Sequence, residues 1–120
     1  MPRIAVFIKP VLDNTKLRFD DQGRPVAEGA PVMMNPYDEY ALETALRLKD
    51  QAIKDGISDL TVSVLALGIP AVCKDILKKA VAAGADDGLI VATDTLPNLD
   101  AAGRSLIMSA LLKQRFSDAQ

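Results

Sequence analysis

The residues of this chain whose types and spacing best suit chemistry form one short run, Asn35-Pro36-Tyr37-Asp38-Glu39. Asparagine is a favoured N-cap, proline suits the first helical position, and Asp38 at the third position can answer the cap as in a capping box. On one interpretation these residues only begin a helix. On the other, the Asn35 amide and the free N–H groups of the helix end face a nucleotide. Spacing alone favours the first interpretation.

A second helix start, at Gly68-Ile69-Pro70, lacks a capping side chain. Pro70 suits the first helical position, but Ile69 at the cap has no acceptor for the N–H groups of the first turn. These groups lie beside Gly68, where the absence of a side chain lets a ligand approach. They could bind an anion or the edge of an adenine, or they could be satisfied by water.

Four other groups of residues are candidate sites. Lys9, at the end of the first apolar run, could pair with a phosphate, pair with Asp13, or be solvated. Cys73 lies on an apolar helical stripe and is expected to be a small core residue. The pairs Asp20-Asp21 and Asp86-Asp87 fall in predicted turns without a third ligand nearby, so we expect them to be solvated.

Composition excludes several kinds of active site. The chain has no histidine, which removes Ser-His-Asp and Cys-His catalysis, and its one cysteine cannot form an internal disulfide or hold a metal alone. A net charge of −2, no tryptophan and few other aromatic residues argue against a nucleic-acid surface. We therefore expect binding without catalysis and without a metal.

Length and apolar runs place the chain in a broad class. Its 120 residues suffice for a single domain over residues 1–120. No apolar run approaches the ~20 residues of a membrane helix. The run that ends at Lys9-Pro10 is too short for a secretory core, so we expect a cytoplasmic protein without membrane insertion.

Apolar periodicity predicts three strands that alternate with three helices. The predicted strands are residues 3–8, 60–67 and 89–92. The predicted helices are residues 36–54, 69–81 and 99–116. Such alternation is typical of an α/β fold, with a three-layer parallel sheet and right-handed crossovers.

Two details of these elements can be checked against a structure. The inner face of the first helix is expected to hold Ala41, Ala45, Leu48 and Ala52 beside Leu42, Leu46 and Ile53. Residues 12–34 interrupt the alternation and read as an irregular hairpin excursion with a turn at 20–23. Such an insertion lies beyond the carboxyl end of a strand, where open α/β sheets bind ligands.

Four stretches of the sequence together resemble one family. They are Lys9-Pro10-Val11-Leu12-Asp13, Asn35-Pro36-Tyr37-Asp38-Glu39 with the helix after it, Leu67-Gly68-Ile69-Pro70, and Ala83-Gly84-Ala85-Asp86. In order and spacing they closely resemble the N-terminal half of the electron transfer flavoprotein beta subunit, over nearly the whole chain. The Asn-Pro-Tyr-Asp-Glu stretch is the most specific part.

The resemblance implies an adenine nucleotide α-hydrolase-like, Rossmann-like fold and a heterodimer with an alpha subunit that holds the redox FAD. Such dimers are not enzymes; they pass electrons from acyl-CoA or other dehydrogenases to an acceptor. The beta subunit holds AMP, or FAD in the same place, and Tyr37 is expected to near the alpha-subunit flavin. With the residues weighed above, the candidate cofactor-binding residues are Phe7, Lys9, Asn35, Pro36, Tyr37, Asp38, Leu67 and Gly68.

The chain departs from the family in length. Members run to about twice this length, and Gln120 falls where a fourth strand is expected, so the chain reads as a fold truncated after the third helix or as a split member. The strands should lie in the order 3-2-1, which leaves residues 3–8 at an open edge. We therefore expect the isolated chain to self-associate and to bind AMP weakly.

Two alternatives stay open. One is a free-standing adenine-nucleotide module of the universal-stress-protein type, although the Gly-x-x-Gly phosphate loop of that family is missing here. The other is an interaction domain that binds no ligand.

Overall fold

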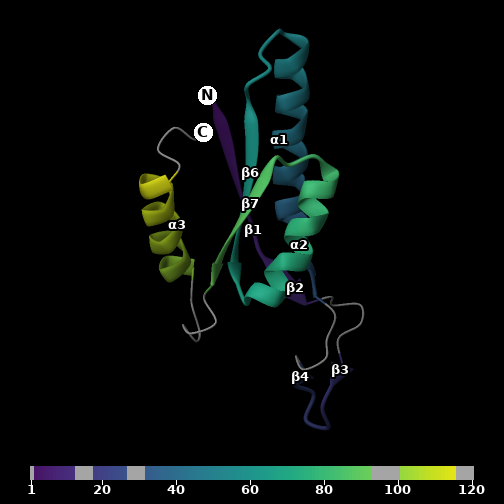
Figure 1. Ribbon diagram of the computed structural model, residues 1–120. Helices are drawn as coiled ribbons and strands as arrows, with labels where there is room; N and C mark the ends of the chain where they lie inside the picture. Colours follow the sequence, from purple (N-terminus) through teal and green to yellow (C-terminus); the bar gives the residue numbers. More distant parts are fainter. Residues whose placement is uncertain (1, 13–17, 27–31, 93–100, 116–120) are drawn as a thin grey trace.

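A computed structural model of the chain describes residues 2–12, 18–26, 32–92 and 101–115 (Figure 1). Its elements, in chain order, are β1 (Arg3–Ile8), β2 (Pro10–Leu12), β3 (Arg18–Phe19), β4 (Pro25–Val26), β5 (Val32–Met34), α1 (Pro36–Lys54), β6 (Thr61–Gly68), α2 (Pro70–Ala83), β7 (Asp87–Ala92) and α3 (Ala101–Arg115). The predicted alternation of strands and helices is confirmed, and the first helix has the predicted bounds.

The central sheet is parallel, with the strand order β1-β6-β7. This order confirms the predicted 3-2-1 arrangement and places β1 at an edge of the described sheet. In the register, Phe7 lies opposite Leu65, and Leu65 lies opposite Leu89. The prediction for the start of the third strand was wrong, because Asp87 and Gly88 already pair with Ser63 and Val64 instead of lying in a turn.

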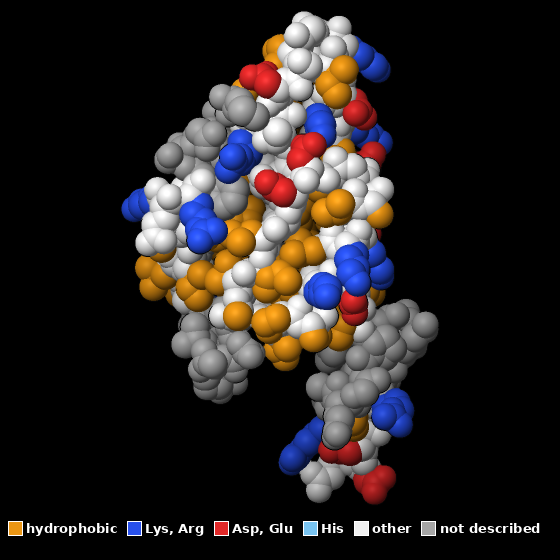
Figure 2. All heavy atoms as spheres, in the orientation of Figure 1, with side chains coloured by type: hydrophobic (Ala, Val, Ile, Leu, Met, Phe, Trp, Pro, Cys, Tyr) orange, Lys and Arg blue, Asp and Glu red, His pale blue; other side chains and the backbone are white. Residues whose placement is uncertain are grey.

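Helices lie on both sides of this sheet, and hydrophobic side chains gather near the centre of the face seen in Figure 2. Figure 1 shows α1 and α2 on one side of the strands and α3 on the other. Side chains of β1, β6, α1 and α2 form the core on the first side; among them are Val6, Val62, Val64, Leu42, Ala45, Ile76 and Ala80. The predicted α/β class, with a parallel sheet and helices on both of its sides, is therefore confirmed for the described residues. None of the helices in these residues is both long enough and apolar enough to cross a membrane.

The inner face of α1 differs from the predicted one. Leu42 and Ala45 are buried as expected, but Leu48 is 55% exposed and Ile53 is 52% exposed. The helix turns Lys49 inward instead, where its Nζ lies 2.6 Å from Oδ1 of Asp86. A lysine can lie on this face because its ammonium group pairs with a carboxylate there. The apolar periodicity of the helix cannot indicate this partner, which is distant in the sequence.

The excursion forms two small antiparallel ribbons in its described parts. β2 pairs with β5, and β3 pairs with β4. The predicted turn is present, since the Asp20 Oδ1 atom accepts hydrogen bonds from the N–H groups of Gln22 and Arg24, both at 2.9 Å. Asp20 therefore shapes the turn instead of being merely solvated. Leu17 and Asp13 lie outside the described residues.

Candidate functional site

The end of β1 and the start of α1 meet at the backbone of Lys9. The Lys9 N–H donates to Oδ2 of Asp38 at 2.9 Å, and the Lys9 carbonyl accepts from the Asn35 N–H at 3.1 Å. These two hydrogen bonds hold the first turn of α1 against the strand end. Four of the predicted site residues therefore lie together at the carboxyl end of β1. They are Lys9, Asn35, Pro36 and Asp38.

Asn35 caps α1, as the sequence predicted. Its Oδ1 atom accepts a hydrogen bond from the Tyr37 N–H at 3.2 Å, and Pro36 occupies the first helical position. The carbonyl of Asn35 accepts from the N–H groups of Asp38 and Glu39. The amide nitrogen of Asn35 has no partner within the described part of the chain. Asn35 as a whole is half-buried.

Two of the possibilities that the sequence raised for this helix start are not found among the described residues. Asp38 does not answer the cap as in a capping box, because the Asn35 N–H is already bonded to Lys9 and the carboxylate bonds the Lys9 N–H instead. Nor are the first N–H groups of the helix free for a ligand. Pro36 has none, and those of Tyr37 and Asp38 are bonded to Asn35.

The carboxyl end of β6 supplies Leu67 and Gly68. Phe7 lies opposite Leu65, so Leu67 projects from the same face of the sheet, one residue pair farther along. Leu67 is buried and Phe7 is half-buried. The structure thus brings these two apolar side chains to neighbouring strands near the same edge, while the Tyr37 side chain is 80% exposed to solvent.

Gly68 is explained by packing. Its φ of +152° disfavours other residues, and a Cβ atom added there would lie 3.1 Å from the Cys73 sulfur and 3.6 Å from a Pro10 side-chain carbon. Packing therefore explains why a glycine stands at position 68, and a ligand is not needed to explain it. Ile69 provides no side-chain cap for α2, as predicted.

An apolar groove of about 190 Å³ lies beside this edge. It is lined by Pro10, Val11, Val32, Ile69 and Val72, none of which was among the predicted site residues. Its volume is below the 300–1,000 Å³ of typical ligand pockets. The described residues therefore present one wall with polar groups at Lys9 and Asn35, and not an enclosed nucleotide pocket.

Asp86 is exposed, as predicted, but its carboxylate also accepts two hydrogen bonds that the sequence did not indicate. Its Oδ1 atom accepts from Nζ of Lys49 at 2.6 Å, and its Oδ2 atom accepts from the Val62 N–H at 2.8 Å. The hydrogen bond from Lys49, followed by that from Val62, lowers the pKa of the Asp86 carboxyl below its usual value. Asp86 thus ties α1 to the start of β6, at the opposite end of the sheet from Lys9.

Cys73 is a core residue, as predicted. It is fully buried, and this burial raises the pKa of its thiol. A neutral, inaccessible thiol is a poor nucleophile. Its role in the described structure is to fill the space beside Gly68.

Residues 25–119 match the electron transfer flavoprotein domain. The chain is 32% identical to protein FixA of Azotobacter vinelandii, over 95% of this chain and 38% of FixA. It is 31% identical to an electron transfer flavoprotein subunit beta of Megasphaera elsdenii, over 96% of this chain and 41% of the relative. It is 30% identical to subunit CarD of the caffeyl-CoA reductase–Etf complex of Acetobacterium woodii, over 93% and 41%. This chain thus spans about two fifths of the length of these relatives.

Proposed function

Because the chain belongs to the electron transfer flavoprotein domain family, we propose that it acts as a beta-type subunit of an electron transfer flavoprotein. In this role it binds a nucleotide, pairs with an FAD-carrying alpha subunit and catalyses no reaction itself. The match over residues 25–119 carries the proposal. Two of the relatives, a subunit beta and a subunit of a reductase–Etf complex, support it by their names.

The nucleotide site of this proposal lies at the carboxyl ends of β1 and β6. The parallel order β1-β6-β7 supports an adenine nucleotide α-hydrolase-like fold, in which ligands lie beyond the strand ends. Lys9 is exposed and offers an ammonium group to a phosphate, and the Asn35 amide nitrogen offers a donor to a ring or a ribose. Phe7 and Leu67 offer apolar surface.

These residues fit AMP, or FAD in the same place, as one wall of a site. Asp38 supports the wall by holding the Lys9 backbone, and Pro36 and Gly68 set the chain direction on either side. The opposite wall would come from residues outside those described or from the alpha subunit. The nucleotide has a structural role here. The side chains of the site bind it and transfer neither protons nor electrons.

Tyr37 is the residue we assign to the contact with the alpha subunit. Its side chain is 80% exposed on the first turn of α1, one residue from the polar wall. The FAD of the alpha subunit supplies the redox chemistry, taking electrons from acyl-CoA or other dehydrogenases. The part of this chain that the structure describes contributes position and contact.

Titration with AMP, ADP and FAD, with and without an FAD-loaded alpha subunit, tests the function. We expect stable pairing with the alpha subunit and electron transfer to an acceptor dye in the presence of a dehydrogenase. Tyr37→Ala should slow this transfer. Tyr40→Ala, which removes a tyrosine that is 71% exposed one turn away, is the matched control.

Two outcomes would replace the proposal. AMP binding without any pairing to an alpha subunit would indicate a free-standing nucleotide module. Neither nucleotide binding nor pairing would indicate an interaction domain without a ligand.

A further inference from the structure

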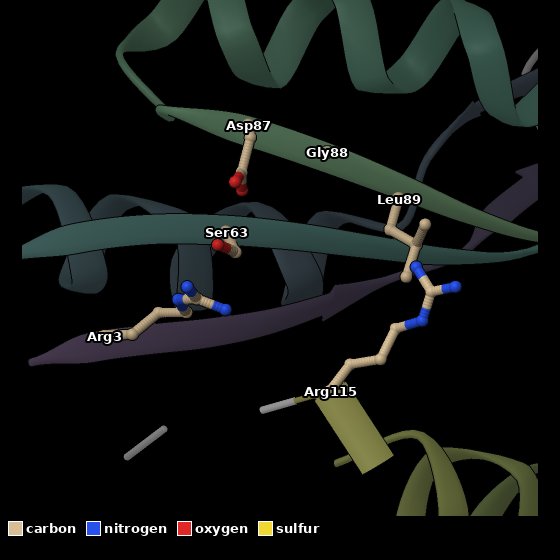
Figure 3. Close-up of a pocket in the computed structure, with 6 residues that line it drawn as sticks. All are labelled: Arg3, Ser63, Asp87, Gly88, Leu89 and Arg115. Atoms are coloured by element: carbon tan, nitrogen blue, oxygen red, sulfur yellow. The ribbon is translucent and has the colours of Figure 1, made fainter. Parts of the chain in front are cut away.

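A second cavity lies at the amino ends of the sheet strands. Lys9 and Asn35 lie at the other end, where the strands have their carboxyl ends. Its volume is about 430 Å³, within the range of ligand pockets. It is lined by Arg3, Ser63, Asp87, Gly88, Leu89 and Arg115 (Figure 3). Arg3 and Asp87 are the first residues of β1 and β7, and Arg115 is the last residue of α3.

Ser63 is the residue of this cavity that needs explaining. It lies on the central strand and is 2% exposed, yet its Oγ atom has no hydrogen-bond partner among the described residues. Val62 and Val64 belong to the core beneath α1 and α2, so Ser63 faces the other side, toward α3. The next residue on that side, Leu65, is apolar. A buried hydroxyl without a partner is costly, so its presence points to a group that it meets.

Charged side chains surround this hydroxyl. Figure 3 shows the Arg3 guanidinium and the Asp87 carboxylate extending from the two outer strands toward Ser63, while Arg115 reaches toward Leu89 from the end of α3. Among the described residues that line the cavity, two guanidinium groups and one carboxylate sum to a formal charge of +1. Arginine presents planar donors that suit carboxylate and phosphate oxygens.

Asp87 narrows the choice of ligand. A carboxylate beside an anion repels it unless the anion carries a hydrogen-bond donor for the carboxylate to accept. Hydrogen phosphate carries such a donor, whereas sulfate at neutral pH does not. The pattern of charges therefore matches an oxyanion with one protonated oxygen or hydroxyl group.

We propose that the cavity lined by Ser63, Asp87 and Arg115 binds a small oxyanion that also carries a hydrogen-bond donor, as hydrogen phosphate does. Ser63 donates its orphaned hydroxyl to the anion, the guanidinium groups neutralise it, and Asp87 accepts from its donor. Nothing in this site depends on the proposed electron-transfer role, because the nucleotide wall lies at the other edge of the sheet.

Calorimetric titration of the 120-residue chain with inorganic phosphate at constant ionic strength tests the site. Ser63→Ala and Arg115→Ala should each weaken phosphate binding about tenfold, the effect of one hydrogen bond to a charged group. Lys113→Ala removes a charge from the same last turn of α3 without touching the cavity and should leave the affinity unchanged. Wild-type protein should bind phosphate more tightly than sulfate, and Asp87→Asn should remove that preference.

Thermal unfolding gives a second readout that does not depend on calorimetry. Phosphate should raise the melting temperature of the wild-type chain by mass action and should have little effect on Ser63→Ala. Without phosphate, Ser63→Ala should be at least as stable as the wild type, because the unpartnered hydroxyl is gone.

Three results would overturn the site. They are no phosphate binding at millimolar concentration, equal weakening by Lys113→Ala and Arg115→Ala, and an unchanged affinity in Ser63→Ala. Equal weakening by the two α3 variants would mean that phosphate is only attracted to the positive charge at the end of this helix. Equal affinity for phosphate and sulfate would overturn the role of Asp87. All of these outcomes leave the nucleotide wall at the opposite edge unaffected.

Discussion

The Asp38 carboxylate accepts a hydrogen bond from the backbone N–H of Lys9 at 2.9 Å, across 29 positions of sequence. The N–H of Asn35 returns a bond to the Lys9 carbonyl at 3.1 Å. Together they fix the position of the α1 cap relative to the end of β1. The polar wall proposed for a nucleotide depends on this pair of bonds, because they hold Lys9 beside the start of α1, where Asn35 lies.

Asp38→Ala should destabilise the chain by about 0.5–1.5 kcal/mol, the net worth of a typical hydrogen bond, because the Lys9 N–H loses its acceptor. Glu39→Ala is the control, since Glu39 is the neighbouring exposed acid and bonds nothing with its side chain among the described residues. Asp38→Asn should recover part of the loss, as an amide oxygen can accept the same bond. Urea unfolding monitored by circular dichroism measures all three. Equal losses for the Asp38→Ala and Glu39→Ala variants would contradict the assignment.

Asn35→Ala should cost about 1 kcal/mol of unfolding free energy through the lost N-cap. If the amide nitrogen also contacts a nucleotide, the affinity for AMP in complex with an alpha subunit should fall beyond what the stability change explains. Asn35→Asp separates the two roles, because a carboxylate caps as well as an amide but offers no N–H donor. Unchanged nucleotide retention in Asn35→Asp would leave Asn35 a cap only.

The contact of Asp86 with Lys49 and Val62 should make stability depend on pH in the acidic range. The folded pKa of Asp86 lies below the usual value of 3.8, so the unfolded chain binds a proton first as the pH falls. The stabilisation is complete above that usual value and is lost as the pH falls through the folded pKa. Asp86→Asn should flatten this part of the curve of unfolding free energy against pH, whereas Asp87→Asn should not. Parallel curves for wild type and Asp86→Asn would show that another acid is responsible.

The open edge of β1 should make the isolated chain associate. After Arg3, the strand runs through five apolar residues without a charge, which is typical of an interior strand and unprotected at an edge. Light scattering over a concentration series should show dimers or larger species. Ala5→Lys should shift them toward monomer, while Ala92→Lys at the other edge strand, β7, should have less effect. A monomer at all concentrations would contradict the prediction, and micromolar AMP affinity of the isolated chain would contradict the expected weak binding.

Local signals were sufficient to predict α1. Asn35 and Pro36 at its start are recognised from the chemistry of helix caps, which involves only adjacent residues, and the helix begins where they predict. The strand order was also predictable, because alternating strands and helices with right-handed crossovers leave few arrangements.

The sequence could not predict contacts between distant residues. Asp38 meets Lys9 and Asp86 meets Lys49, at separations of 29 and 37 positions. Helical periodicity assigned Leu48 to the inner face because it counts apolar residues, whereas the structure turns Lys49 inward toward a carboxylate. Ser63 lies within the predicted strand 60–67, but only the structure shows that its hydroxyl is buried without a hydrogen-bond partner among the described residues.

The ribbon of β2 with β5 brings the two ends of the excursion together, with Pro10 opposite Met34 and Leu12 opposite Val32. Pro10 follows Lys9 directly, and Met34 directly precedes Asn35, so the residues joined at the strand end stay in place whatever lies between. Evolution can therefore lengthen, shorten or exchange the intervening segment without moving the sheet or α1. For protein engineering, these three rungs are the natural junction at which to graft the excursion of one relative onto another.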